Sequence, residues 1–224
     1  MKRIEEVTLL YEISKALNEH MDLRKTLYSV LDILSSSMDM IRGTVTILDL
    51  LRNEINIEVA HGLSKSAVKS VKYKLGEGIT GRVIETGKPT AIPKISEEPE
   101  FLNRTATRKS KKDQERSFIC VPIKTGKQVI GALSVDKSFN ENYPLKQGQK
   151  LLSVVAAMIA QHVVRLETIK REKEQLREEN KRLKEELENK YTITNIGGNS
   201  NKMRVVYQMI SLVSKSKATV LIRG

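Results

Sequence analysis

Three arginines in one polar segment are the residues of this chain best suited to bind a charged ligand. Arg104, Arg108 and Arg116 fall within residues 94–117, a charged stretch with neither helical nor strand periodicity. A planar guanidinium group can form two parallel hydrogen bonds with a carboxylate, and long loops in compact domains are often functional. We therefore predict that one or more of these arginines binds an anionic ligand. The sequence leaves open a solvated charged loop in a domain that senses through protein contacts or binds nothing.

A glycine-rich run is the second feature that suggests chemistry. Residues 75–89 read Leu-Gly-Glu-Gly-Ile-Thr-Gly-Arg-Val-Ile-Glu-Thr-Gly-Lys-Pro, and glycines that open a helix can hold a phosphate on free backbone N–H groups. The run lacks the Gly-Lys-Ser/Thr ending of a phosphate loop and the spacing of a dinucleotide fingerprint. Ile79 and Val83 instead fall at helical spacing, Gly87 suits a left-handed C-cap, and Pro89 prevents continuation. We predict one short helix between tight turns.

Cysteine and histidine usage argues against a metal or redox centre. Cys120 is the only cysteine, so neither a disulfide within the chain nor a cysteine-ligated metal site can be built. It lies in a predicted strand with no histidine near it in sequence. His162 has no accompanying cysteine or carboxylate cluster and is expected to be a packing residue. We predict no metal site and no catalytic residue.

Composition and charge narrow the classes of partner. The formal net charge of +12 raises nucleic acids and membrane surfaces as partners. Much of the excess lies between Arg104 and Arg116, and no helix-turn-helix pattern or aromatic platform accompanies it, so we do not expect nucleic-acid binding by these residues. No apolar run reaches about 18 residues and the N-terminus lacks a signal peptide's apolar core. We expect a cytoplasmic protein without membrane contact.

The elements that must position these residues follow from hydrophobic periodicity. Two amphipathic helices come first, one from Ile4 to near His20 and one with Asp22 as its N-cap. Alternation of apolar and polar residues then predicts strands. These strands cover residues 44–47, 55–59, 90–93, 118–123 and 129–135, with a short helix and a short strand within 66–74. Pro122 should sit at a bulge or where no ladder bond is donated.

From Leu145 the helical period continues for more than forty residues and becomes a heptad repeat. The repeat predicts a homodimer through a parallel coiled coil, with leucines at position d and one asparagine at position a to fix the register. The alternative is a single solvated helix. The predicted dimerisation residues are Leu152, Ile159, Leu166, Ile169, Leu176, Asn180, Leu183 and Leu187. After Tyr191 a different pattern begins, with a helix carrying Met203 and a buried strand over residues 218–224.

Two family resemblances rest on these motifs. The two leading helices and hairpin, the run 75–89, Val121-Pro122-Ile123 and residues 129–136 together resemble a GAF domain. Residues 196–200 with Met203, together with residues 219–224, resemble the opening of the AAA+ domain of sigma-54-dependent transcription activators. Residues 60–63, 92–99, 101–105 and 117–124 are similar to the NifA-type branch, which activates nitrogen-fixation genes.

The resemblance implies an α+β fold: a GAF domain with a central antiparallel sheet flanked by helices, followed by a long coiled-coil helix. It implies a GAF sensory domain over residues 1–164, a signalling linker over 165–190 and the start of an AAA+ domain over 191–224. The fragment would not be an enzyme. ATP, Mg, sigma-54 RNA polymerase and DNA would bind through domains absent from it.

The same resemblance implies candidate effectors, namely 2-oxoglutarate or a PII-type signalling protein. No cysteine lies between Asp136 and Gly224, unlike the oxygen-sensitive NifA type, whose linker carries paired cysteines. Alternatives remain open: a sensor of another sigma-54 activator with a different ligand or an iron centre, or a protein-interaction module with no small ligand. A phosphodiesterase or histidine kinase sensor would also keep the GAF pattern, but residues 196–224 argue against it.

Overall fold

The structure is a computed structural model that describes residues 3–49, 54–64, 68, 72–99, 101–102, 115–141, 143–190, 198, 200–214 and 219–221. The chain divides into two compact units, Met1–Glu167 and Thr168–Gly224. The first unit contains the β-sheet, the two hydrophobic cores that lie on its opposite faces, and the candidate functional site.

One antiparallel sheet organises the first unit, and among the described residues it has six strands in the order β3-β2-β1-β6-β5-β4. The strands are β1 (Met40–Asp49), β2 (Glu54–His61), β3 (Lys72–Lys74), β4 (Thr90–Ile92), β5 (Arg116–Thr125) and β6 (Gln128–Ser138). Every pair of neighbours is antiparallel. The predicted α+β class and central antiparallel sheet are confirmed.

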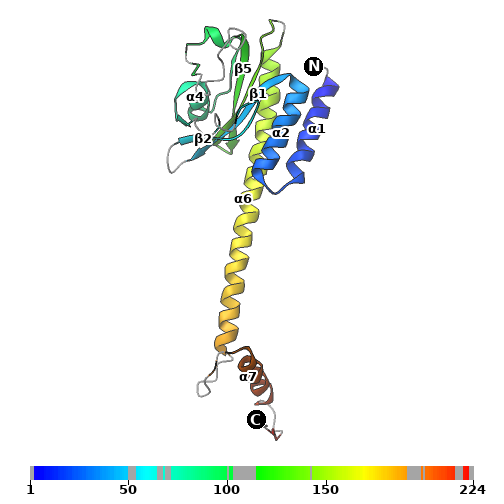
Figure 1. Cartoon of the computed structure of the whole chain (residues 1–224), viewed down its shortest axis with the longest axis vertical. Coiled ribbons are helices and arrows are strands. Elements are labelled where there is room, and N and C mark those ends of the chain that lie inside the picture. The colour runs from blue at the N-terminus through cyan, green and yellow to red at the C-terminus, as the bar shows by residue number, and fades with distance from the viewer. Residues whose placement is uncertain are drawn as a thin grey trace. The chain divides into compact units, whose positions relative to one another are not determined.

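Helices cover both faces of this sheet. Figure 1 shows α1, α2 and the start of α6 on one side of the strands and α4 on the other. The helices are α1 (Arg3–Glu19), α2 (Leu23–Met38), α4 (Gly78–Thr86) and α6 (Leu145–Lys190), with a 3-10 turn η1 at Ile95–Glu97. The sheet is therefore buried on both faces.

Alternation along β5 shows how one strand serves two cores. Ile119, Val121 and Ile123 are at most 1% exposed and join the core beneath α1, α2 and α6. Phe118 and Cys120 point the other way and join the smaller core beneath α4. This follows from the period of two in a strand, where successive side chains take opposite faces.

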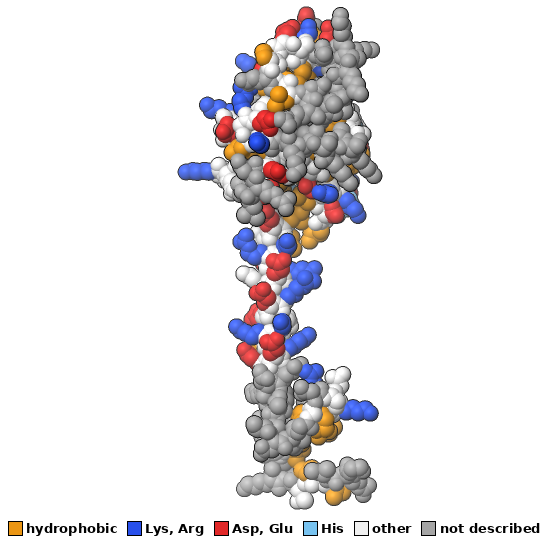
Figure 2. Space-filling model, turned by 60° about the vertical axis from the view of Figure 1, so that its left-hand side comes forward, with side chains coloured by type: hydrophobic (Ala, Val, Ile, Leu, Met, Phe, Trp, Pro, Cys, Tyr) orange, Lys and Arg blue, Asp and Glu red, His pale blue; other side chains and the backbone are white. Residues whose placement is uncertain are grey.

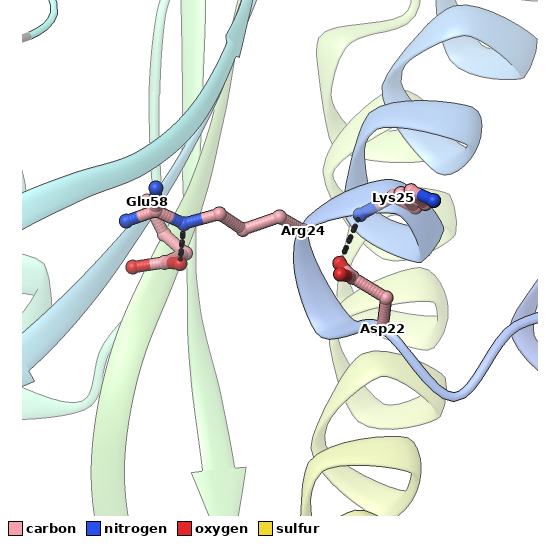
Figure 3. A network of polar contacts seen from close by, with 4 residues as sticks. All are labelled: Asp22, Arg24, Lys25 and Glu58. Carbon is pink, nitrogen blue, oxygen red and sulfur yellow. Dashed lines mark hydrogen bonds and ion pairs between the residues drawn. The ribbon is translucent and has the colours of Figure 1, made fainter.

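Local sequence signals explain where the helices begin and end. At the start of α2, the Asp22 carboxylate accepts a hydrogen bond of 3.0 Å from the Lys25 N–H (Figure 3), as expected of an N-cap. At the end of α4, Gly87 has a φ of 64° and its N–H donates to the Val83 carbonyl. Both predicted caps are confirmed.

Pro122 is accommodated as its chemistry requires. It lies beyond β4, which pairs with β5 only over Phe118–Cys120, and a register shift follows between Ile123 and Lys124. A proline is tolerated in a strand where no ladder bond is needed or beside a bulge.

The predicted loop over residues 94–117, for which we expect at most one helical turn, needs correction at its C-terminal end. Its first part contains η1, and its last two residues already belong to β5. Arg116 is therefore a strand residue paired with Ser138 of β6, and it is only 9% exposed. Arg116 and Ser117 are polar and therefore gave no strand signal in the sequence. They belong to β5 because they pair with Ser138 and Lys137 of β6.

The heptad prediction was wrong for its first two positions. Leu152 and Ile159 are fully buried in the core of the first unit together with Val155. Their contacts are made within the chain, so they do not belong to a dimer seam. The repeat could not separate the two uses, because a helix packed on a sheet and a coiled-coil helix both place apolar residues at spacings of three and four.

By length and composition alone, α6 includes a stretch apolar enough to cross a membrane. Leu152, Val155 and Ile159 lie in α6 and are fully buried in the domain core. Packing against the sheet therefore explains their apolar character.

In the second unit, α6 continues to Lys190 and α7 covers Asn201–Val213. The Ser200 hydroxyl accepts a hydrogen bond from the Met203 N–H at the N-cap of α7. The predicted C-terminal buried strand is wrong for residues 219–221, which are exposed and unpaired with any described strand. A strand is buried only when neighbouring strands and a covering layer exist.

Candidate functional site

A cavity lies between the sheet and the N-terminal end of α4. It has a volume of about 40 Å³, which is room for about three water molecules. Its wall combines residues of β1, β2, β5, β6 and α4 with Phe101 and Leu102. Pockets for drug-sized ligands measure about 300–1,000 Å³, so a ligand larger than a few heavy atoms would have to displace wall residues.

The charged groups of the wall and most of its hydroxyl groups come from the two central strands, and Thr80 of α4 adds one more hydroxyl. Arg42, Thr44 and Thr46 of β1 line it opposite Ser134 and Asp136 of β6. Their alternate spacing puts all five on the α4 face of the sheet. The antiparallel pairing of β1 with β6 brings together Arg42 and Asp136, which are 94 positions apart in the chain, and Thr44 and Ser134, which are 90 positions apart.

A register shift in β1 directs Arg42 into the cavity. Met40 pairs with Lys137 and Arg42 with Asp136, so Ile41 is an extra residue in the ladder. Met40 packs in the core on the face of the sheet that α1, α2 and α6 cover. Residues two positions apart in a strand normally point to the same face, but the extra residue acts as a β-bulge, and Arg42 therefore points to the opposite face.

The polar groups of the wall are linked to one another. Arg42 Nη1 lies 3.9 Å from Asp136 Oδ2, and these side chains are 12% and 3% exposed. The hydroxyls of Thr44 and Ser134 are 2.6 Å apart, and the Thr46 hydroxyl donates to the Ala132 carbonyl at 3.2 Å. A buried ion pair beside several hydroxyls suits a ligand with polar groups of its own.

Cys120 lies behind this wall and is chemically quiet. Complete burial raises the pKa of its thiol to about 12, while a hydrogen bond with Thr80 acts in the opposite direction. The thiolate is the nucleophilic and metal-binding form, so a neutral buried thiol serves neither role. Within the described part of the chain, no three His, Cys, Asp or Glu side chains are grouped to hold a metal ion.

Of the three predicted ligand-binding arginines, the structure describes the position of one, Arg116. Arg116 shares the α4 face of β5 with Phe118, two residues away, and is buried rather than carried by a loop. Arg104 and Arg108 lie outside the described residues. The sequence did not reveal Arg42 and Asp136 as a pair, because the bulge and the strand register that join them leave no local pattern.

The predicted dimerisation residues fall into two groups. Leu152 and Ile159 are core residues, and Leu166 is half-buried in the first unit. In the second unit the apolar heptad side chains stand in solvent: Ile169 is 36%, Leu176 59% and Leu183 46% exposed. Asn180 is also exposed, and its side-chain amide donates to the Leu176 carbonyl at 3.2 Å. The side chain of Leu187 lies outside the described residues.

Comparison with solved structures supports the same fold. The GAF domain of A. aeolicus nlh2 in an inactive state superposes with a TM-score of 0.61 at 25% identity, covering 72% of this chain and 96% of that one. The GAF domain of a phosphoenolpyruvate-protein phosphotransferase from Coxiella burnetii gives a TM-score of 0.66 at 18% identity, covering 75% and 98%.

Curated relatives are named for nitrogen fixation or its regulation. The chain is 39% identical over 223 residues to the nitrogen fixation protein VnfA of Azotobacter vinelandii, covering 99% of this chain and 43% of the relative. It is 38% identical to AnfA of the same organism, covering 99% and 42%. It is 35% identical to a Nif-specific regulatory protein of Herbaspirillum seropedicae, covering 98% and 40%. The chain thus spans less than half the length of these relatives.

The GAF sequence profile matches residues 22–163, more than half of the chain, and those residues contain the sheet, α4 and the cavity. The chain belongs to the GAF domain family and is homologous over nearly its whole length to regulators of nitrogen fixation.

Proposed function

We propose that the chain is the regulatory part of a cytoplasmic, NifA-type sigma-54-dependent activator of nitrogen-fixation genes. The observation that carries this proposal is similarity at 35–39% identity over 98–99% of the chain, including residues beyond the GAF domain. ATP hydrolysis with Mg, contact with sigma-54 RNA polymerase and DNA binding would belong to the rest of the protein. The fragment itself would act as a sensor and not as an enzyme.

The test compares the longer protein with a form that lacks residues 1–167, the first compact unit. Transcription from a sigma-54-dependent nitrogen-fixation promoter should differ between the two forms when nitrogen supply changes. If both forms respond identically to nitrogen supply, the regulatory role is wrong. If neither form activates the promoter, the assignment to this class of activators is wrong.

The effector would reach the GAF domain either as a small molecule or as a protein. The cavity, with its ion pair and hydroxyls, supports a small ligand. 2-Oxoglutarate is a candidate for Arg104 and Arg108, which lie outside the described residues. The small volume of about 40 Å³ restricts the size of a ligand in the cavity, and the second candidate is a PII-type protein that binds the surface. Calorimetric titration with millimolar 2-oxoglutarate tests this one ligand, since a domain that senses only protein contacts would give no heat with it.

A homodimer through the exposed part of α6 is the proposed signalling unit. Ile169, Leu176 and Leu183 recur every seven residues and stay exposed in the single chain, which is how a coiled-coil seam looks without its partner. Figure 2 shows Lys, Arg, Asp and Glu side chains along the rest of this helix. Because α6 is one helix from Leu145 to Lys190, a change in its packing would carry the signal.

A further inference from the structure

Two opposite charges face the same small cavity. Arg42 and Asp136 both line it, are largely buried, and stand 3.9 Å apart between Nη1 and Oδ2. At this separation the two atoms attract one another but are too far apart for a direct hydrogen bond. A ligand carrying a carboxylate and an ammonium group close together could bond to both residues at once.

The balance of charge among the described residues of the wall disfavours a dianion. Arg42 and Asp136 are the charged residues among those described as lining the cavity, and their charges cancel. A dicarboxylate would bring two negative groups beside the Asp136 carboxylate, and like charges repel more strongly in a poorly hydrated site than in bulk water. A ligand with no net charge has no such penalty.

The remaining wall suits a small apolar group. Ile57, Ile79, Phe101 and Phe118 contribute apolar surface, and the rings of Phe101 and Phe118 meet edge to face at 5.1 Å between centroids. The volume of about 40 Å³ is smaller than even alanine, which has six non-hydrogen atoms, so wall residues must move when an amino acid enters. A short apolar side chain keeps this movement small.

From these features we propose that the cavity binds the zwitterion of a small apolar α-amino acid. The carboxylate bonds to the Arg42 guanidinium, the ammonium group bonds to the Asp136 carboxylate, and the side chain lies against the apolar wall. This inference rests on the proposed sensory function of the domain and names the class of its effector.

Matched probes test each charged group of the ligand in turn. The purified chain is titrated by calorimetry with L-alanine, L-valine, 3-methyl-2-oxobutanoate, isobutylamine and 2-oxoglutarate. The keto acid lacks the ammonium group of valine and the amine lacks its carboxylate. Loss of a hydrogen bond to a charged group costs about tenfold or more in affinity, so both should bind at least about tenfold more weakly than valine.

Variants locate the binding site. Asp136→Asn and Arg42→Gln should each weaken amino-acid binding about tenfold or more, but each leaves one buried charge without its counterpart and can unfold the domain. The double variant with both changes removes both charges and should fold, yet fail to bind. Glu58→Gln is the matched control, because it removes the partner of Arg24 at an ion pair outside the cavity (Figure 3).

The outcomes separate the inference from the proposed function. Preference for an amino acid over the keto acid and the amine, lost in the double variant and kept in Glu58→Gln, supports the inference. Tighter binding of 2-oxoglutarate than of either amino acid overturns it and preserves a small-molecule sensor. Absence of binding by all five probes also overturns it, whereas the regulatory function fails only in the transcription test.

Discussion

Leu152→Ala and Leu176→Ala form a matched pair that separates the two roles of α6. Both leucines occupy core positions of one heptad repeat, but Leu152 is fully buried and Leu176 is 59% exposed. The same three carbon atoms are removed in each case. The two variants should therefore differ in which property they change.

The expected size of each effect follows from burial. Leucine-to-alanine changes at fully buried sites cost about 2.7–5.0 kcal/mol of unfolding free energy, including the cavity left behind. For a domain of 150–250 residues, each kcal/mol lowers the melting temperature by about 2–4 °C. Leu152→Ala should thus lower the melting temperature of the GAF domain by about 6 °C or more. Leu176→Ala should change the unfolding free energy of the monomer by no more than about 0.5 kcal/mol.

Two assays read these effects independently. Thermal unfolding followed by tyrosine fluorescence, available because the chain has six Tyr and no Trp, reports the stability of the folded chain at one fixed protein concentration. Sedimentation equilibrium reports association. Leu176→Ala should weaken association and Leu152→Ala should not. A Leu152→Ala protein with an unchanged melting temperature and weakened association would refute the placement of Leu152 in the domain core.

Two further substitutions and one labelling experiment test other parts of the structure. Gly81→Ala should destabilise the protein by about 1–3 kcal/mol in urea unfolding despite the better helix propensity of alanine, because the new Cβ would lie 2.6 Å from the Lys74 carbonyl oxygen; a gain in stability would contradict this close approach. Asn180→Leu should tighten association or change the oligomeric state in sedimentation, since a polar residue at position a weakens a seam; unchanged sedimentation would argue against a seam there. The Cys120 thiol should react with a thiol reagent only after unfolding. Burial raises its pKa from 9.0 to about 12, so the folded state keeps a proton that the unfolded state loses, and this contribution to stability should fall as pH rises above about 9; a prompt reaction of the folded protein at pH 8 would contradict its burial.

The local elements were predictable because their signals are local. Asp22 and Gly87 cap α2 and α4 where the sequence placed them, since capping depends on a side chain or backbone conformation within a few residues. Alternation also located β1, β2, β5 and β6. It missed the first residues of β5, where Arg116 and Ser117 are polar and are held in the sheet by pairing with Ser138 and Lys137.

The candidate site was less predictable because it depends on long-range pairing. The arginines chosen from the sequence were the clustered ones, and clustering is visible without a structure. Arg42 stands alone in the sequence and becomes a cavity residue through the bulge at Ile41 and the pairing of β1 with β6. Asp136 was part of the GAF-like motif, but its partner was not.

The sequence by itself determined the caps and ends of the helices, the alternating strands and the absence of an intrachain disulfide, because periodicity, turn residues and composition are properties of neighbouring residues. The GAF fold followed from the resemblance of its motifs to that family. Only the tertiary structure decided that the heptad of α6 serves first as domain core at Leu152 and Ile159 and then as an exposed stripe at Leu176 and Leu183. It also decided that Arg42 and Asp136 share one cavity. Burial and contact between distant residues depend on which surfaces the folded chain brings together. The seven-residue repeat looks the same in the part of α6 that is buried in the domain core and in the part that is exposed, so the sequence alone does not separate them.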